Sequence, residues 1–216
     1  MSDGANFKHI GLTAGLLMMF AIVGALIVSA SYVGTRDRIL ENERQALLRN
    51  LNAIIPAGEY DNDLVSSVLT LSPANKLAQT EESQAYRAMK NGEVSAIVFR
   101  VTAPNGYSGA IKLLIGVYRD GRVAGVRVVA HKETPGLGDA IEIERSDWLL
   151  GFDGKSLGDP DSKHWKVKRD GGVFDQFTGA TITPRAVVQA VHNTLLYFNS
   201  HRESLLNVNI PDDEGS

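Results

Sequence analysis

The sequence predicts an α+β protein in which one N-terminal transmembrane helix precedes a domain with a twisted antiparallel sheet flanked by helices. Three observations predict this fold: an uncharged stretch of 24 residues at 10–33, alternating apolar residues between 94 and 130, and apolar residues at helical spacing after Pro184. A chain of 216 residues with 44% hydrophobic content is long enough for one domain of ordinary size and an appendage.

The composition excludes several classes of site and partner. The formal net charge is −3 and no run is rich in Lys and Arg, so we expect no nucleic-acid partner. The lack of cysteine excludes disulfides, catalytic thiolates, cysteine-ligated iron–sulfur clusters and haem attached through a CxxCH motif. If the protein carries electrons, the carrier must be organic, or a metal held by nitrogen and oxygen.

The uncharged stretch Ile10–Val33 is interpreted as a membrane anchor. As a helix it would extend about 36 Å, enough to cross a hydrocarbon core of about 30 Å. A cleaved signal peptide is the alternative, because Val28-Ser29-Ala30 resembles a cleavage site. The stretch is longer than the apolar region of a signal peptide, roughly 7–15 residues, and only Lys8 provides a firm charge before it, which favours a retained anchor.

After the tail and anchor of residues 1–34, a helical stalk and linking region is predicted over residues 35–93. Arg36–Ile55 reads as a charged helix with a partial apolar stripe, and Pro56 ends it. Asp61–Leu71 predicts a second short helix, and the polar stretch Ser72–Asn91 ends in a turn at Asn91-Gly92.

The main domain is predicted over residues 94–207, with a disordered tail at 208–216. Strands are expected at Val94–Val101, Ile111–Tyr118 and Val123–Ala130, with Asp120-Gly121 as the hairpin turn between the last two. A helix is expected around Asp139–Leu150, and Trp148 and Trp165 are expected to pack in the core or to edge a binding pocket.

Two glycine-rich loops interrupt the predicted sheet. The first, Pro104–Gly109, presents the aromatic ring of Tyr107 and the hydroxyl of Ser108, although a plain strand connection also explains these residues. The second, Glu133–Gly138, follows a strand, and its proline and two glycines fix an unusual backbone path. Backbone N–H groups left open in that loop could bind a flat polar ring.

The stretch 175–181, Asp-Gln-Phe-Thr-Gly-Ala-Thr, presents a hydroxyl group just before a helix. Gly179 and Ala180 leave little side-chain bulk around Thr181 and no base stands beside it, which favours modification by another enzyme over nucleophilic catalysis. Thr183 is predicted to be the N-cap and Pro184 the first helical residue. A phosphate on Thr181 would therefore lie near the positive end of a helix, although a structural turn also explains the residues alone.

The pattern Asp-x-x-Thr-Gly-Ala-Thr resembles the acceptor motif of the FMN-binding domain family, in which a flavin transferase joins FMN to the last threonine through a phosphoester. The resemblance implies that Thr181 carries the flavin and that Asp175 and Thr178 belong to the signal that the transferase reads. The loop 133–138, the Tyr-Ser-Gly at 107–109 and Lys168–Gly172 occur in the order found in the G subunit of Rnf electron transport complexes. This resemblance implies that Glu133, Thr134 and Leu137 lie beside the isoalloxazine ring, with Leu137 on its face. The candidate FMN-binding residues are Tyr107, Ser108, Glu133, Thr134, Leu137, Lys168, Asp175, Thr178, Gly179, Ala180 and Thr181.

The same resemblance implies a membrane-anchored flavoprotein that relays electrons within an ion-translocating ferredoxin:NAD oxidoreductase. Such a redox subunit has no catalytic residue or substrate turnover of its own, and its partners are the other subunits, the flavin transferase and membrane lipid. The family places the domain on the periplasmic side of the bacterial inner membrane. The positive-inside rule disagrees, because the arginines at 36, 38 and 44 outnumber Lys8 and would leave the domain in the cytoplasm.

Two other functions are weighed against this one. The C subunit of the sodium-translocating NADH:quinone reductase resembles this chain, but it has serine at the position of Thr178 and is usually longer. A membrane-anchored sensory or structural module with the same fold is the second alternative. A metal site is not expected, since His131, His164, His192 and His201 show no ligand spacing.

Overall fold

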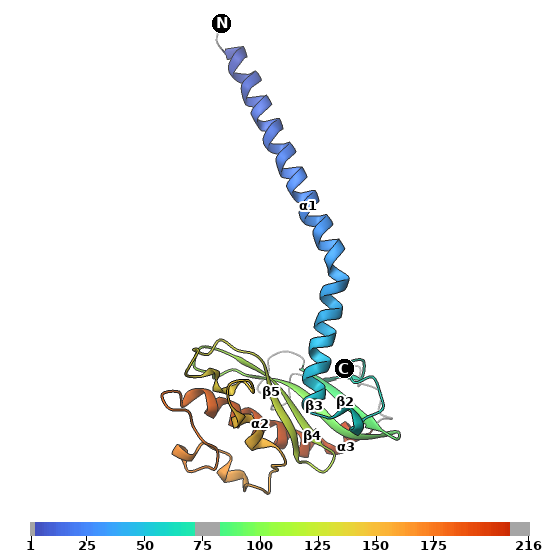
Figure 1. The fold of residues 1–216 in the computed structure, drawn as a ribbon, viewed down its shortest axis with the longest axis vertical. Coiled ribbons are helices and arrows are strands. Elements are labelled where there is room, and N and C mark those ends of the chain that lie inside the picture. The colour runs from blue at the N-terminus through green and yellow to red at the C-terminus, as the bar shows by residue number, and fades with distance from the viewer. Residues whose placement is uncertain (1–2, 72–82, 208–216) are drawn as a thin grey trace. The chain divides into compact units, whose positions relative to one another are not determined.

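The computed structural model describes residues 3–71 and 83–207, in two compact units that divide between Ala46 and Leu47. The tail at 208–216, which we expected to be disordered, lies outside the described residues, and so does most of the polar stretch 72–91. Figure 1 shows the order of the elements along the chain.

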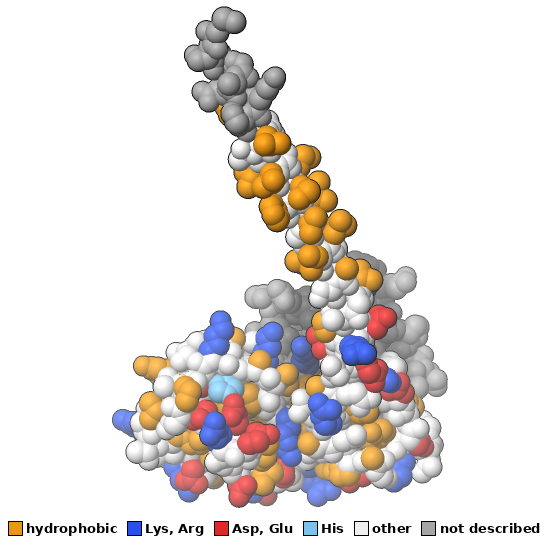
Figure 2. Space-filling model, turned by 45° about the horizontal axis from the view of Figure 1, so that its top comes forward, with side chains coloured by type: hydrophobic (Ala, Val, Ile, Leu, Met, Phe, Trp, Pro, Cys, Tyr) orange, Lys and Arg blue, Asp and Glu red, His pale blue; other side chains and the backbone are white. Residues whose placement is uncertain are grey.

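The first unit is formed by the long helix α1, Asp3–Asn52, up to Ala46, and the last residues of this helix, from Leu47 on, belong to the second unit. From Ile10 onward this helix contains an 18-residue stretch with a mean hydropathy of 2.4, and no residue of that stretch is buried. The helix is therefore long and apolar enough to cross a membrane. Figure 2 shows hydrophobic side chains along this part of the helix. The predicted membrane anchor and the predicted charged helix after it are therefore one continuous element.

The second unit contains a five-stranded antiparallel sheet in the order β1-β2-β3-β4-β5. The three predicted strands are found as β3, Glu93–Ala103, β4, Ile111–Tyr118, and β5, Val123–Ala130. The predicted hairpin turn is also found, because the Gly121 N–H donates to the Tyr118 carbonyl at 2.9 Å and Gly121 has φ of 94°.

Two further strands were not predicted. The short helix expected over Asp61–Leu71 was wrong, because β1 occupies Val68–Leu71. β2 occupies Ser83–Lys90, in the polar stretch of the linking region for which no helix or strand was predicted. Charged and polar residues in β2 hide its alternation in the sequence, but Tyr86 pairs with Val98 of β3 and is buried there. Pairing with a neighbouring strand thus determines the extended conformation of a segment whose local sequence pattern is weak.

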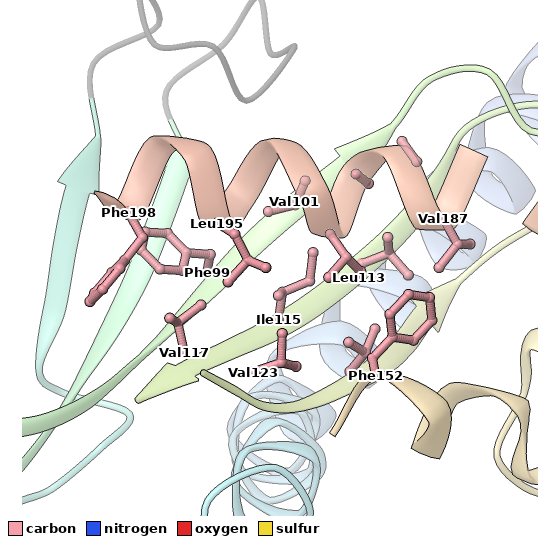
Figure 3. Close-up of a cluster of buried hydrophobic side chains, with 14 of the residues drawn as sticks. Phe99, Val101, Leu113, Ile115, Val117, Val123, Phe152, Val187, Leu195 and Phe198 are labelled. Atoms are coloured by element: carbon pink, nitrogen blue, oxygen red, sulfur yellow. The ribbon is translucent and has the colours of Figure 1, made fainter. Parts of the chain in front are cut away.

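Helices cover both faces of the sheet. On one face, α2 (Ile182–Ser200) packs Val187, Leu195 and Phe198 against side chains from β3 and β4, as Figure 3 shows. On the other face, Leu51 and the following Ile54 and Ile55 pack with Tyr86, Val98 and Leu114. The short helix α3, Arg202–Leu206, follows α2. The predicted α+β architecture is therefore confirmed.

The helix expected around Asp139–Leu150 is replaced by two 3₁₀ helices, η2 at Asp139–Ile141 and η3 at Asp147–Phe152. Ser146 lies between them, where its hydroxyl donates to the Ala140 carbonyl at 2.6 Å and accepts the Trp148 N–H at 3.3 Å. Such side-chain bonds to nearby backbone compete with a continuous helix. The remaining 3₁₀ helices are η1 at Ala57–Glu59, η4 at Ser162–His164 and η5 at Lys168–Asp170.

Candidate functional site

A cavity of about 350 Å³ lies where the loop after β3, the loop after β5 and the start of α2 meet. Its volume falls in the range of small-molecule sites, roughly 300–1,000 Å³. Seven of the predicted site residues line it, together with three residues that the sequence analysis did not name as site residues. The lining consists of Tyr107, Glu133, Thr134, Leu137, Gly138, Gly179, Ala180, Thr181, Ile182 and Thr183.

A tight turn over 177–180 places Thr181 in this lining. The Ala180 N–H donates to the Phe177 carbonyl at 3.2 Å, and Gly179 has φ of 81°, which favours glycine at the third position of the turn. A β-carbon at position 179 would lie 3.4 Å from Leu137 Cδ2. The side chain of Leu137 therefore rests against the turn that precedes Thr181.

The helix α2 starts two residues earlier than predicted. Thr181, not Thr183, is the N-cap residue, and among the described residues no side-chain cap bond is made there. The partly exposed Thr181 hydroxyl is therefore not used in capping. Thr183 is the second helical residue and is buried, with Pro184 in the third position, still within the first turn, where proline is tolerated.

Glu133 explains why Thr183 does not cap the helix. Its buried carboxylate accepts the hydroxyl of Thr183 at Oε2 and the backbone N–H of Ser108 at Oε1, the latter at 3.0 Å. Gly138 leaves room for this carboxylate, because a β-carbon there would come within 2.8 Å of Glu133 Oε2. One side chain thus joins the three segments that form the cavity.

Exposed side chains form much of the rest of the wall, whereas the backbone N–H groups of residues 136–138, which we expected to be open, are hydrogen-bonded within residues 134–139. Tyr107 is 68% exposed and Leu137 is 46% exposed, so both offer apolar surface to a ligand. Thr134 is exposed as well, and its carbonyl accepts the Leu137 and Gly138 N–H groups at 3.1 and 3.0 Å. Ser108 contributes its N–H to Glu133, but it does not line the cavity.

Three other predicted site residues lie outside the cavity lining. Lys168 Nζ lies 2.6 Å from Asp175 Oδ1, and both side chains are largely exposed. Thr178 is exposed in the turn. The structure therefore does not bring these three residues to the cavity.

Trp148 contacts the predicted acceptor segment, residues 175–181. Its indole N–H donates to the Asp175 carbonyl at 2.9 Å, and its ring lies edge-on to Phe177 with centroids 5.0 Å apart. Trp148 is half-buried, whereas Trp165 is buried in the core. Sequence reasoning placed both tryptophans in the core or at the pocket edge, and it had no signal for the bond to Asp175.

A contact between Arg185 and Asp170 holds the loop 168–172, which precedes the acceptor segment. Arg185, in the first turns of α2, donates two hydrogen bonds to Asp170 at 2.6 and 2.8 Å. These hydrogen bonds lower the pKa of the Asp170 carboxyl and raise that of Arg185. The loop 168–172 is thereby tied to the same helix whose N-terminus faces the cavity.

Comparison with known proteins gives two kinds of match. The sequence profile of the FMN-binding domain matches residues 106–196, and that of the RnfG N-terminal region matches residues 1–54. The G subunit of the ion-translocating oxidoreductase complex of Pseudomonas aeruginosa is 52% identical over 205 residues, 94% of this chain and 95% of that protein. Proteins of the same name from Pseudoalteromonas atlantica and Vibrio cholerae are 46% and 45% identical, over 88% and 89% of this chain and 88% and 91% of their own lengths.

Proposed function

Since the chain belongs to the RnfG family of ion-translocating oxidoreductase complexes, we propose that it relays electrons through one FMN joined by a phosphoester to Thr181. It is an FMN-binding, membrane-anchored redox subunit of such an Rnf complex. Family membership also sets aside the alternative of the C subunit of the quinone reductase.

The residues of the cavity fit FMN. Leu137, Tyr107 and Ile182 provide apolar surface for a flat ring, and Gly179 and Ala180 allow close approach of the chain to the ligand. The first N–H groups of α2 point toward the end where Thr181 stands, and such groups favour a phosphate. When bound, FMN supplies transfer of one or two electrons.

The observation that supports attachment to Thr181 is the difference between its hydroxyl and that of the nearby Thr183. Thr181 lines the cavity, is partly exposed and is free of a capping bond within the described residues. The hydroxyl of Thr183 is buried and is donated to Glu133. Thr178 is exposed but lies outside the cavity lining, so of the threonines at 178, 181 and 183 only Thr181 combines access for an enzyme with a place in the lining.

Attachment needs a flavin transferase as a partner. The transfer forms a bond between Thr181 Oγ1 and the phosphorus of an activated flavin nucleotide, and it breaks the bond from that phosphorus to its leaving group. The transferase has to accept the proton of the hydroxyl. Gly179 and Ala180, which precede Thr181 and have little bulk, give such an enzyme access.

Mass spectrometry of the denatured chain tests the attachment. In protein from a host with the transferase, wild type and Thr183→Val should keep a flavin adduct and in-gel fluorescence, whereas Thr181→Ala should lose both. Thr183→Val preserves the shape of the side chain and removes its hydroxyl, so it is the matched control. An adduct retained in Thr181→Ala would place the bond elsewhere, and an unmodified wild-type chain would favour a module that works without covalent flavin.

The domain is proposed to lie on the periplasmic side of the inner membrane, with α1 as a single-pass anchor in contact with lipid. The chain contains no cysteine, so one introduced cysteine can report the side. Asn105→Cys, at an exposed position of the domain, should react with a membrane-impermeant maleimide in cells with a permeabilised outer membrane. Ser2→Cys should react only after the inner membrane is opened, and the reverse pattern would place the domain in the cytoplasm.

A further inference from the structure

In the chain, His131 lies just before the loop 133–138, between the end of β5 and Glu133. We propose that His131 is a positioning residue for this loop and that it acts as a neutral imidazole protonated on Nε2. Its effect on the flavin rests on the function proposed above, whereas its effect on the loop does not.

The two ring nitrogens of His131 contact two different partners. Nδ1 accepts the backbone N–H of Glu133 at 3.0 Å, and Nε2 lies 2.8 Å from Glu142 Oε1. The side chain is only 11% exposed, so water does not readily replace these partners. Both contacts are within ordinary hydrogen-bond distance.

The partners determine where the proton is. A backbone N–H can only donate, so Nδ1 must offer its lone pair and carry no proton. The remaining proton of a neutral imidazole is then on Nε2, where it donates to the Glu142 carboxylate. A doubly protonated ring would lose the bond to Glu133, because neither nitrogen could accept.

A second set of contacts fixes the same loop further along. Arg145 Nε lies 3.6 Å from Glu142 and 3.7 Å from Asp139, and Asp139 accepts the Gly136 N–H at 2.8 Å. The amides of Glu133 and Gly136 are therefore both held by one group of polar side chains, His131, Asp139, Glu142 and Arg145. This group lies on the wall of a separate cavity of about 540 Å³, which His131, Glu142 and Arg145 help to line.

The position of Glu133 in turn affects the cavity beside Thr181. Its backbone is held by His131, and its side chain holds the amide of Ser108 and the hydroxyl of Thr183. A shift at His131 would therefore move all three segments of that cavity. His131 itself is absent from the lining, which is why its role is to position and not to contact the ligand.

Three substitutions at position 131 distinguish the roles of the two ring nitrogens. Asparagine places an oxygen near the position of Nδ1, so His131→Asn keeps an acceptor for the Glu133 N–H and loses the bond to Glu142. Glutamine reaches the position of Nε2, so His131→Gln keeps a donor for Glu142 and loses the acceptor. His131→Ala removes both, and His164→Asn on η4 serves as a control for replacing a histidine elsewhere.

Amide hydrogen exchange of the full chain in detergent measures the effect directly. We expect the Glu133 amide to exchange about tenfold faster in His131→Gln and His131→Ala than in wild type, and at nearly the wild-type rate in His131→Asn and His164→Asn. Equal rates in all variants, or fast exchange in His131→Asn as well, would overturn the proposal.

Nitrogen NMR of the chain labelled in its histidine rings checks the protonation state at pH 7. The signals that disappear in His131→Asn should show one protonated and one unprotonated nitrogen, with the proton on Nε2. A proton on Nδ1, or on both nitrogens, would overturn the assignment.

The flavin readout separates this proposal from the one it rests on. In flavin-loaded protein, His131→Gln should shift the midpoint potential while His131→Asn leaves it unchanged, because only the former releases the loop. If the exchange pattern is found and the wild-type chain carries no flavin, the positioning role stands and the proposed function fails. If flavin is attached and the exchange pattern is absent, the proposed function stands and the positioning role fails.

Discussion

The hydroxyl of Thr183 donates a hydrogen bond to the carboxylate of Glu133, 50 residues earlier in the chain, and both side chains are buried. This contact ties the first turn of α2 to the loop after β5. It also buries the hydroxyl of Thr183 and leaves Thr181 as the partly exposed one of these two threonines in the cavity lining.

Thr183→Val should destabilise the protein, because Glu133 would keep only the Ser108 N–H as a partner in a buried place. An unmade hydrogen bond of this kind costs about 1–3 kcal/mol. Thr183→Ser keeps the hydroxyl and loses one methyl group, so it should cost about 0.8 kcal/mol. Thermal unfolding of the full chain in detergent measures both, and equal stability of wild type and Thr183→Val would show that the bond contributes nothing.

Leu137→Ala should keep the flavin adduct and shift its midpoint potential. The leucine is 46% exposed and rests against Gly179, so its loss changes the surface offered to the ring and not the phosphoester. Leu150→Ala, at a leucine of 41% exposure outside the cavity lining, is the control. Spectroelectrochemical titration compares the two, and an unchanged potential in Leu137→Ala would place that side chain away from the ring.

Trp148→Phe should loosen the acceptor segment while keeping an aromatic ring against Phe177. The loss of the indole bond to the Asp175 carbonyl corresponds to about 0.5–1.5 kcal/mol, or amide exchange over 175–180 faster by roughly two- to tenfold. Trp165→Phe loses bonds to the Ser156 and Pro160 carbonyls instead and should leave 175–180 unchanged. The same exchange rates in both variants would argue against a specific role for Trp148.

Arg185→Gln should raise the pKa of Asp170 toward its ordinary value near 3.9, since the hydrogen bonds from Arg185 lower it. The folded-state pKa is depressed, so the contribution of this pair to stability is present above about pH 3.9 and is lost as the pH falls through the folded value. Carboxyl carbon NMR gives the titration. Arg122→Gln, whose arginine pairs with Asp120 at 2.7 Å, should leave Asp170 unchanged, and an unaltered titration in Arg185→Gln would refute the pairing.

Local patterns in the sequence determined much of the fold. The hydropathy of α1, the alternation in β3, β4 and β5, the turn at Asp120-Gly121 and the spacing in α2 were all predicted, because each is set by residues close together in the chain. The motifs also predicted which segments concern the ligand, and the loops at 104–109 and 133–138 do meet the residues before α2.

Only the tertiary structure decided the features that depend on distant partners. β2 is a strand because β3 pairs with it. By contrast, η2 and η3 replace a helix through bonds of Ser146 to backbone close to it in the chain. Thr183 is a good cap by sequence, but a buried carboxylate accepts its hydroxyl, and desolvation makes that bond worth more than a cap at the surface. The bonds from Trp148 to the Asp175 carbonyl and from His131 to Glu142 join segments that no local pattern connects.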